Sequence, residues 1–245
     1  MTAPAKFVWY DVMTTDMRAA ESFYTRVVGW SAKDSGMPNG GYTLFSAGDT
    51  MAGGLMPIPE DAARMGVRPA WMGYIGVDNV DECAARVRQA GGKVHKAPQD
   101  IPNVGRFAVC GGPGGEGFII YQSNNPAPPS APDKPGFVGW RELHGADLKR
   151  DWNFYSSLFG WTKDQAMDMG PMGTYQLWKA GDQVCGGMMT KGAEEPGAHW
   201  IYYINVASIT AAEQRIKDAG GKILHGPAQV PGDMWIINAL DPQGA

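Results

Sequence analysis

Glu142 and His144 are the pair of side chains in this sequence best suited to acid–base chemistry. They stand two positions apart in residues 138–144, which we expect to form a strand, and alternate residues of a strand point to the same face. The carboxylate and the imidazole are therefore expected within hydrogen-bond reach. A carboxylate beside tryptophan has its charged form destabilised, which raises its pKa toward the range useful to a general base. We predict Glu142 and His144 as the catalytic residues of any reaction.

Simpler interpretations of this pair stay open. Glu142 could pair with a nearby basic side chain, and Arg141, Lys149 and Arg150 are all close in the sequence. His144 could be a strand-end histidine that bonds to the backbone. In either case the two residues would be satisfied polar groups without a catalytic role.

A tryptophan stands two residues before Glu142, and another stands two residues before Asp11. These residues are Trp140 and Trp9, so each indole is expected on the face of its acidic group. The predicted ligand-binding residues are Trp9, Asp11, Trp71, Trp140, Trp200 and Tyr202. Aromatic walls with an acidic floor suit a flat or hydrophobic molecule, or a cation held over the indoles. The alternative is that the tryptophans only fill the core.

The elements that must position these residues occur twice. The pattern Trp9, Asp16, Phe23-Tyr24 and Gly29-Trp30 returns as Trp140, Asp147, Phe154-Tyr155 and Gly160-Trp161. A repeat of this length indicates two copies of one module of about 120 residues. Residues 123–136 carry five prolines and no large apolar side chain, which predicts an extended linker. We therefore expect module 1 at residues 1–122 and module 2 at residues 137–245.

Each module is predicted to begin with a strand followed by an amphipathic helix. The expected N-cap and C-cap residues are Asp16 with Gly29, and Asp147 with Gly160. Hairpin turns are predicted at Gly48-Asp49 and Gly181-Asp182. A further strand, a second helix and closing strands follow, and the last strand of module 1 has no counterpart in module 2. The pattern predicts an α+β fold of four βαβββ units that form two modules with curved mixed sheets.

This ordered set resembles the vicinal oxygen chelate superfamily, which groups glyoxalases, bleomycin-resistance proteins and extradiol dioxygenases. The residues that carry the resemblance in module 1 are Asp16…Phe23-Tyr24…Gly29-Trp30, Gly53-Gly54, Ala90-Gly91-Gly92 and Pro113-Gly114-Gly115. Their counterparts in module 2 are Asp147…Phe154-Tyr155…Gly160-Trp161, Gly186-Gly187, Ala219-Gly220-Gly221 and Asp241-Pro242-Gln243-Gly244. The likeness covers nearly the whole chain apart from the linker. It is similar, more narrowly, to the tandem, Trp-rich, glyoxalase-like proteins of bacteria.

The metal ligands that the resemblance implies are missing from their positions. Metal-dependent members place ligands where this chain has Trp9 and Trp140, Trp71 and Trp200, and Ile119. An indole nitrogen only donates, and isoleucine has no donor or acceptor atom. The four histidines, His95, His144, His199 and His225, form no HxH or HxxxH pair. We therefore expect no metal site and no cofactor.

Composition excludes several classes of partner. The net charge of −4 is small and the lysines and arginines are scattered, so nucleic acid is not expected as a partner. Three cysteines without CxxC spacing predict neither a disulfide framework nor a structural zinc site. The chain has no apolar run long enough to span a membrane and no apolar leader segment. These features predict a cytoplasmic protein with a small-molecule ligand, and they leave a homodimer open.

Two hypotheses about function follow. The first is a protein that binds a small, aromatic or hydrophobic molecule in Trp-lined pockets without a metal of the family type. The alternative is a metal-independent lyase, isomerase or hydroxylase-type enzyme that uses Glu142 as its general base; an enzyme of this family would be a lyase or an oxidoreductase. Asp11 and Met13 hold the positions of Glu142 and His144 in module 1, so catalysis is expected only in module 2. The missing ligand set favours the binding hypothesis.

Overall fold

The computed structural model describes residues 3–37, 41–125 and 133–245, so half of the predicted linker, residues 126–132, lies outside the described residues. The chain divides into two compact units, and each unit draws on both sequence repeats. Unit 1 consists of the described residues of Met1–Trp9, Met72–Pro129 and Trp140–Tyr202. Unit 2 consists of those of Tyr10–Trp71, Ser130–Gly139 and Tyr203–Ala245. The compact units therefore interleave the two repeats.

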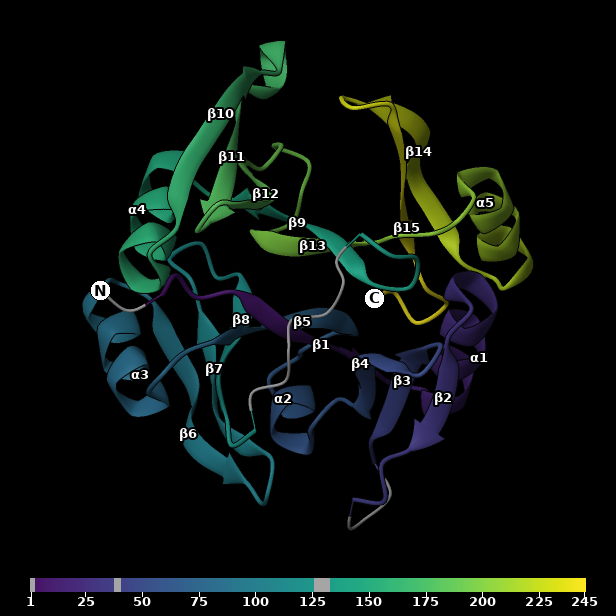
Figure 1. The fold of residues 1–245 in the computed structure, drawn as a ribbon, viewed down its shortest axis with the longest axis horizontal. Helices are drawn as coiled ribbons and strands as arrows, with labels where there is room; N and C mark the ends of the chain where they lie inside the picture. The colour runs from purple at the N-terminus through teal and green to yellow at the C-terminus, as the bar shows by residue number, and fades with distance from the viewer. Residues whose placement is uncertain (1–2, 38–40, 126–132) are drawn as a thin grey trace. The chain divides into compact units, whose positions relative to one another are not determined.

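Unit 1 combines the second and third βαβββ motifs (Figure 1). Its sheets have the strand orders β5-β8-β7-β6 and β10-β11-β12-β9-β13. Parallel pairing of β5 with β8 and of β9 with β12 alternates with antiparallel hairpins, so both sheets are mixed. The strands, some of which extend into unit 2, are β5 (Ala70–Gly76), β6 (Lys93–Ile101), β7 (Gly105–Gly111), β8 (Gly117–Ser123), β9 (Val138–Gly145), β10 (Thr162–Asp168), β11 (Thr174–Ala180), β12 (Gln183–Thr190) and β13 (His199–Ile204). The helices are α3 (Val80–Gln89), α4 (Leu148–Phe159) and the 3-10 turn η1 (Gly170–Met172).

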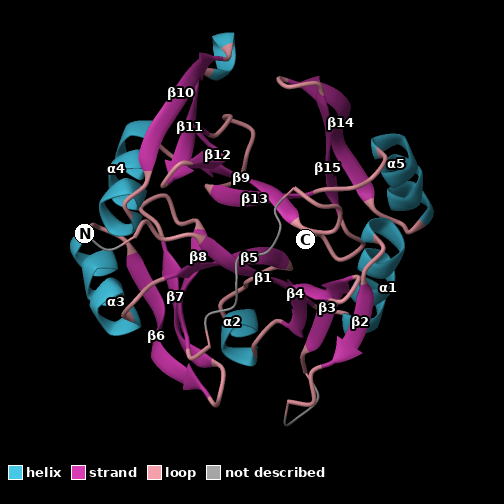
Figure 2. Ribbon diagram, viewed as in Figure 1, coloured by secondary structure: helices cyan, strands magenta, loops and turns pink. Residues whose placement is uncertain are grey.

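Unit 2 combines the first and fourth motifs (Figure 2). Its strands are arranged as β2-β3-β4-β1 and as the pair β14-β15. The strands are β1 (Phe7–Thr14, which begins in unit 1), β2 (Ser31–Asp34), β3 (Thr43–Ala47), β4 (Thr50–Pro57), β14 (Lys222–Val230) and β15 (Met234–Leu240). The helices are α1 (Met17–Val28), α2 (Glu60–Arg64) and α5 (Ile209–Asp218). Among the described residues, the fourth motif supplies no counterpart of β8. The α+β fold of four βαβββ units is confirmed.

The predicted helix caps are present in both copies. The side chain of Asp16 accepts a hydrogen bond from the amide of Ala19 at 3.0 Å, and Asp147 accepts one from that of Arg150 at 2.7 Å. Gly29 and Gly160 end these helices with φ of 88° and 68°. A residue with a Cβ rarely adopts this left-handed conformation, so glycine is the favoured residue at both helix ends. Local sequence therefore determines where α1 and α4 begin and end.

Each unit packs its two long helices together through an equivalent arginine. In unit 1, Arg86 of α3 donates to the carbonyls of Ser157 and Leu158 at 2.7 and 3.0 Å. In unit 2, Arg215 of α5 donates to the carbonyl of Val27 at 2.9 Å. The last carbonyls of a helix have no partner within the helix, and the helix dipole favours a cation there. The two arginines therefore stabilise the carboxyl ends of α4 and α1.

Both cores are rich in stacked aromatic rings. In unit 1, Trp161 stacks on Trp178 with ring centroids 3.9 Å apart, and the strand residue Leu143 is buried in the same core. In unit 2, Trp30 stacks on Phe45 at 5.0 Å. None of the helices among the described residues has both the length and the apolar character needed to cross a membrane. The faces of the strands that these cores leave uncovered are where a site can form.

Candidate functional site

Strand β9 presents Trp140, Glu142 and His144 on the face opposite the core. Arg141, Leu143 and Gly145 are buried, whereas the three alternate residues are half-buried. Leu143 belongs to the core of unit 1, so its neighbours in sequence must point the other way. The prediction that Glu142 and His144 share a face and lie within hydrogen-bond reach is confirmed, because His144 Nε2 is 3.0 Å from Glu142 Oε1. Their catalytic role remains a prediction.

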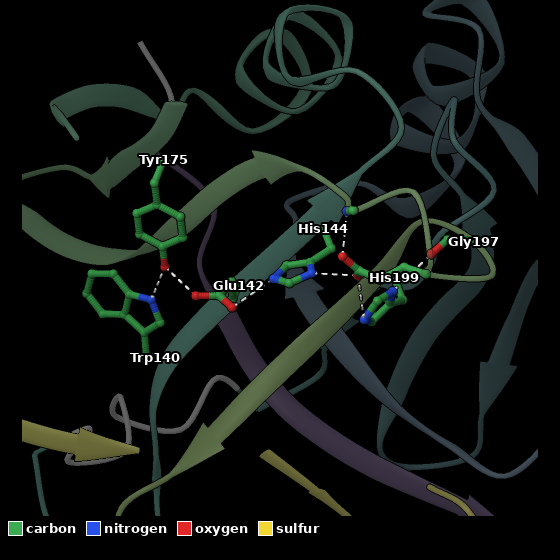
Figure 3. A network of polar contacts seen from close by, with 8 residues as sticks. Trp140, Glu142, His144, Tyr175, Gly197 and His199 are labelled. Atoms are coloured by element: carbon green, nitrogen blue, oxygen red, sulfur yellow. Dashed lines mark hydrogen bonds and ion pairs between the residues drawn. The ribbon is translucent and has the colours of Figure 1, made fainter. Parts of the chain in front are cut away.

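A chain of hydrogen bonds fixes Glu142 on this face (Figure 3). Tyr175 of β11 donates from its hydroxyl to Glu142 Oε2 at 2.5 Å, and the same hydroxyl accepts from Trp140 Nε1 at 2.8 Å. His144 contacts the other carboxylate oxygen. Both oxygens of Glu142 thus have a partner, and only 14% of its side chain is exposed. The carboxylate is held in one orientation.

The paired glycines of the sequence repeat make room for this tyrosine. Gly187 lies beside Glu142 in the parallel pair of β12 with β9, and a Cβ at Gly187 would collide with the ring of Tyr175. Unit 2 repeats the arrangement: Tyr42 donates to Asp11 at 2.7 Å, and a Cβ at Gly54 would collide with Tyr42. The tyrosine–carboxylate pair therefore occurs twice. Neither tyrosine was predicted as a site residue from the sequence, although the repeated Gly-Gly follows both at the same spacing.

The network in unit 1 continues beyond Glu142. His144 Nδ1 lies 2.6 Å from Glu195 Oε2, and His199 Nε2 lies 3.7 Å from the same oxygen. Glu195 comes from the loop between β12 and β13. Burial opposes the charge on His144, but the carboxylates of Glu142 and Glu195 outweigh it and raise the pKa of His144 above its ordinary value. In the first repeat Met13 stands at the position of His144, so no such network is possible from that position.

Three of the residues predicted to bind a ligand, Trp71, Trp200 and Tyr202, pack in or against the cores of their own units. Trp200 is buried in the core of unit 1, and Tyr202 stacks on it with ring planes 13° apart. Trp71 packs against the core of unit 2. On β13 it is His199, not Trp200, that points toward Glu195. The prediction for β13 was therefore wrong by one residue, because adjacent residues of a strand point to opposite faces of the sheet.

The two displaced tryptophans belong to a buried arrangement that occurs once in each unit. Trp200 Nε1 donates to the hydroxyl of Tyr155 at 3.2 Å, and that hydroxyl donates to Glu116 at 2.9 Å. In unit 2, Trp71 Nε1 donates to Tyr24 at 2.9 Å, and Tyr24 donates to Asp241 at 3.1 Å. These Trp–Tyr–carboxylate triads explain why both tryptophans face the helices: each indole N–H finds its partner there.

The carboxylates of the two triads come from different positions of the repeat. Asp241 belongs to the Asp-Pro turn of the fourth motif, where the second motif has Gly112. A Cβ at Gly112 would collide with the carboxylate of Glu116, which fills the same space from four residues further on. Burial raises the pKa of Glu116, and its second oxygen has no hydrogen-bond partner among the described residues. The triad is a structural element of the core.

The positions at which relatives would hold a metal do not fit one in this chain. The indole nitrogens of Trp140, Trp200 and Trp71 donate to tyrosine hydroxyls, and an N–H donor has no lone pair for a metal. Ile119 is buried and carries no ligand atom. Trp9 is half-buried and has the same limitation. These positions therefore cannot support a mechanism through a metal ion.

Comparison with known proteins agrees with this fold. The family model of the Glyoxalase/Bleomycin resistance protein/Dioxygenase superfamily matches residues 6–120 and 139–245. The chain belongs to this superfamily. Among superfamily relatives, it is 31% identical to the Mycobacterium bovis protein named "Putative glyoxylase CFP32", over 97% of this chain and 91% of that protein. It is 30% identical to the anthracycline biosynthesis protein DnrV of Streptomyces peucetius, over 99% of this chain and 92% of that protein.

Solved structures of the superfamily share the fold at low identity. The Mn(II)-bound glyoxalase from Novosphingobium aromaticivorans superposes with a TM-score of 0.67 at 18% identity, covering 100% of this chain and 81% of that one. The 2,3-dioxygenase LapB from Pseudomonas sp. KL28 gives a TM-score of 0.68 at 15% identity, covering 100% of this chain and 91% of that one. These likenesses support the superfamily fold. A shared fold does not define the reaction, which depends on the residues of the site.

Proposed function

We propose that this superfamily member binds a small, flat, aromatic or hydrophobic molecule on the Glu142 face of β9. The observation that carries the proposal is the Trp140–Tyr175–Glu142 chain of hydrogen bonds. It holds an indole and a carboxylate in fixed orientations while both remain partly exposed. An aromatic ligand would stack on Trp140, and a hydroxyl or amine of the ligand would donate to Glu142. Side chains fixed before binding lose little entropy when the ligand arrives.

Further observations support this choice of ligand and of unit. Two relatives are named anthracycline biosynthesis proteins, and an anthracycline is a flat polycyclic aromatic molecule. Asp11, the counterpart of Glu142, is only 2% exposed, which favours the second repeat as the binding site. Because Trp71, Trp200 and Tyr202 pack in the cores, the proposed contact surface is smaller than the sequence suggested. No family-type metal is required for a ligand held by stacking and by a carboxylate.

Titration with a hydroxyanthraquinone, followed by tryptophan fluorescence and calorimetry, tests the proposal. Trp140→Leu should weaken binding by roughly tenfold, since loss of stacking and of apolar contact is worth about 1.4 kcal/mol. Trp152→Leu is the matched control, because Trp152 lies on α4 and packs against the core side of the sheet. Equal affinity for wild type and Trp140→Leu, or equal losses in both variants, would contradict the proposal.

A second candidate function is general-base catalysis by Glu142 in a metal-independent lyase or isomerase. The observation that favours it is that Tyr175 and His144 each contact one carboxylate oxygen of Glu142. These contacts fix the carboxylate in one orientation, and a general base must be held in line with the proton that it removes. Glu142 would take a proton from an acidic carbon of the ligand, leaving an enolate that is reprotonated at the same or a neighbouring atom.

Deuterium exchange distinguishes catalysis from binding. Anthrone, an aromatic ketone with an acidic methylene group, is incubated with the protein in heavy water and followed by NMR. Catalysis predicts exchange faster than in buffer, loss of the acceleration in Glu142→Gln, and a partial loss in Tyr175→Phe. Exchange at the buffer rate, or an unchanged rate in Glu142→Gln, leaves binding as the function that the site performs.

A further inference from the structure

We propose that His144, Glu195 and His199 bind a divalent transition-metal ion, at a place distinct from the family's ligand positions. The ligand atoms of these three residues lie within 4.8 Å of one another. His144 is four residues beyond Trp140 on β9, which corresponds to about 13 Å along a strand. Two imidazoles and one carboxylate form the donor set that suits Zn²⁺, Co²⁺, Ni²⁺ or Fe²⁺. The sequence predicted no metal site here, because the four histidines form no HxH or HxxxH pair and His144 lies 51 residues before Glu195.

The hydrogen bonds of His199 leave the correct nitrogen free for a metal. Its Nδ1 lies 3.0 Å from the carbonyl oxygen of Gly197, and a carbonyl can only accept. Nδ1 must therefore carry the hydrogen, and in the neutral ring the lone pair is on Nε2. Nε2 is the nitrogen that points toward Glu195, at 3.7 Å. A backbone carbonyl behind the ring is a common outer partner of metal-binding histidines.

His144 has the same arrangement with a carboxylate behind it. Its Nε2 contacts Glu142 Oε1 at 3.0 Å, whereas its Nδ1 faces Glu195 Oε2 at 2.6 Å. With a metal on Nδ1, the Nε2–H would donate to Glu142, and Tyr175 would hold Glu142 in turn. A carboxylate–histidine–metal relay of this kind fixes the tautomer and raises the basicity of the ligand. Glu142 is thus a positioning residue for the proposed ion.

Glu195 is also oriented before any ion binds. The amide of Gly192 donates to its Oε1 at 2.6 Å, which turns Oε2 toward the two imidazoles. Two ligand atoms around a tetrahedral ion with bonds of about 2.1 Å are roughly 3.4 Å apart. Glu195 Oε2 lies 2.6 Å from His144 Nδ1 and 3.7 Å from His199 Nε2, so the two distances lie on either side of that value. The exposed fractions of the His144, Glu195 and His199 side chains are 16, 28 and 43%. The ion would therefore reach the site from solvent and keep open positions for water or a ligand.

Calorimetric titration of tag-free, chelator-treated protein with Zn²⁺, and absorption spectroscopy with Co²⁺, test the proposal. Wild type should bind one equivalent, and bound Co²⁺ should show intensified visible bands of a four- or five-coordinate ion. Glu195→Gln and His199→Gln should each lower affinity by 100-fold or more. His225→Gln is the matched control, since His225 is an exposed histidine of β14. Glu142→Gln should bind at least tenfold more weakly than wild type, as expected for an outer partner.

Several outcomes would overturn the proposal. The proposal is wrong if wild type does not bind Zn²⁺ or Co²⁺ at micromolar concentrations. It is also wrong if both Glu195→Gln and His199→Gln bind the metal as tightly as wild type does. Circular dichroism of each metal-free variant separates lost ligands from lost folding, and the partly exposed His199 is the position at which folding should be least affected. The test is independent of the proposed aromatic ligand, because the metal ion alone is titrated. A protein that binds the anthraquinone but no metal would refute this inference alone.

Discussion

Tyr155→Phe should destabilise unit 1 strongly, although it removes a single oxygen atom. The ring is kept, so its stacking on Trp161 with planes 8° apart is preserved and only the hydroxyl is lost. That hydroxyl accepts from Trp200 and donates to Glu116, which are 7% and 1% exposed. Each buried group left without its partner costs about 1–3 kcal/mol. The two losses together predict a decrease in the free energy of unfolding of roughly 2–6 kcal/mol.

Tyr24→Phe in unit 2 is the internal control for this prediction. It breaks the equivalent triad, but Trp71 is half-buried, so water can reach its indole. Asp241 also keeps hydrogen bonds from the amides of Gln243 and Ala245, both 2.9 Å long. The cost should therefore be smaller, about 1–2 kcal/mol.

Urea unfolding followed by tryptophan fluorescence and by far-ultraviolet circular dichroism measures both variants. Two probes are needed because two compact units need not unfold in one transition. In a thermal melt, the difference between the variants should appear as roughly 2–4 °C for each kcal/mol. A loss in Tyr155→Phe of about 0.5 kcal/mol or less, or one no larger than in Tyr24→Phe, would refute the argument that burial of both partners makes this hydroxyl costly to remove.

Three further predictions follow from the described contacts. Burial raises the pKa of Glu116 above its ordinary value of 4.5, so its contribution to stability is complete below its unfolded pKa and is lost as pH rises through its folded pKa. Glu116→Gln should therefore gain stability relative to wild type as pH rises above 4.5, and a difference in urea unfolding that stays constant with pH would contradict this. Arg86→Ala should cost about 1 kcal/mol by removing the guanidinium from the carboxyl end of α4, and an additive double variant with Arg215→Ala would show that the two contacts act independently. Gly187→Ala should displace Tyr175 and abolish anthraquinone binding while the far-ultraviolet spectrum stays native; unchanged affinity would mean that Tyr175 does not orient the site.

Local patterns in the sequence were sufficient for the elements and for one half of the site. The repeat and the helix caps depend on residues a few positions apart, so Asp16, Gly29, Asp147 and Gly160 could be assigned directly. The same is true of Glu142 and His144, because two side chains at alternate positions of one strand must share a face. Outer strands such as β6 and β10 were missed, since few of their residues are buried and they give little apolar alternation.

Only the tertiary structure decided which face each strand turns toward the site. Alternation places His199 and Trp200 on opposite faces, but it does not say which face is the core, and Trp200 is held there by Tyr155, a residue 45 positions away. Likewise, Tyr175 and Glu195 reach Glu142 and His144 from other elements of unit 1. Such contacts depend on how separate segments pack, and that packing has no local signature. The sequence alone therefore determined the superfamily fold and the pairing of Glu142 with His144, whereas the three-dimensional packing determined the partners of that pair.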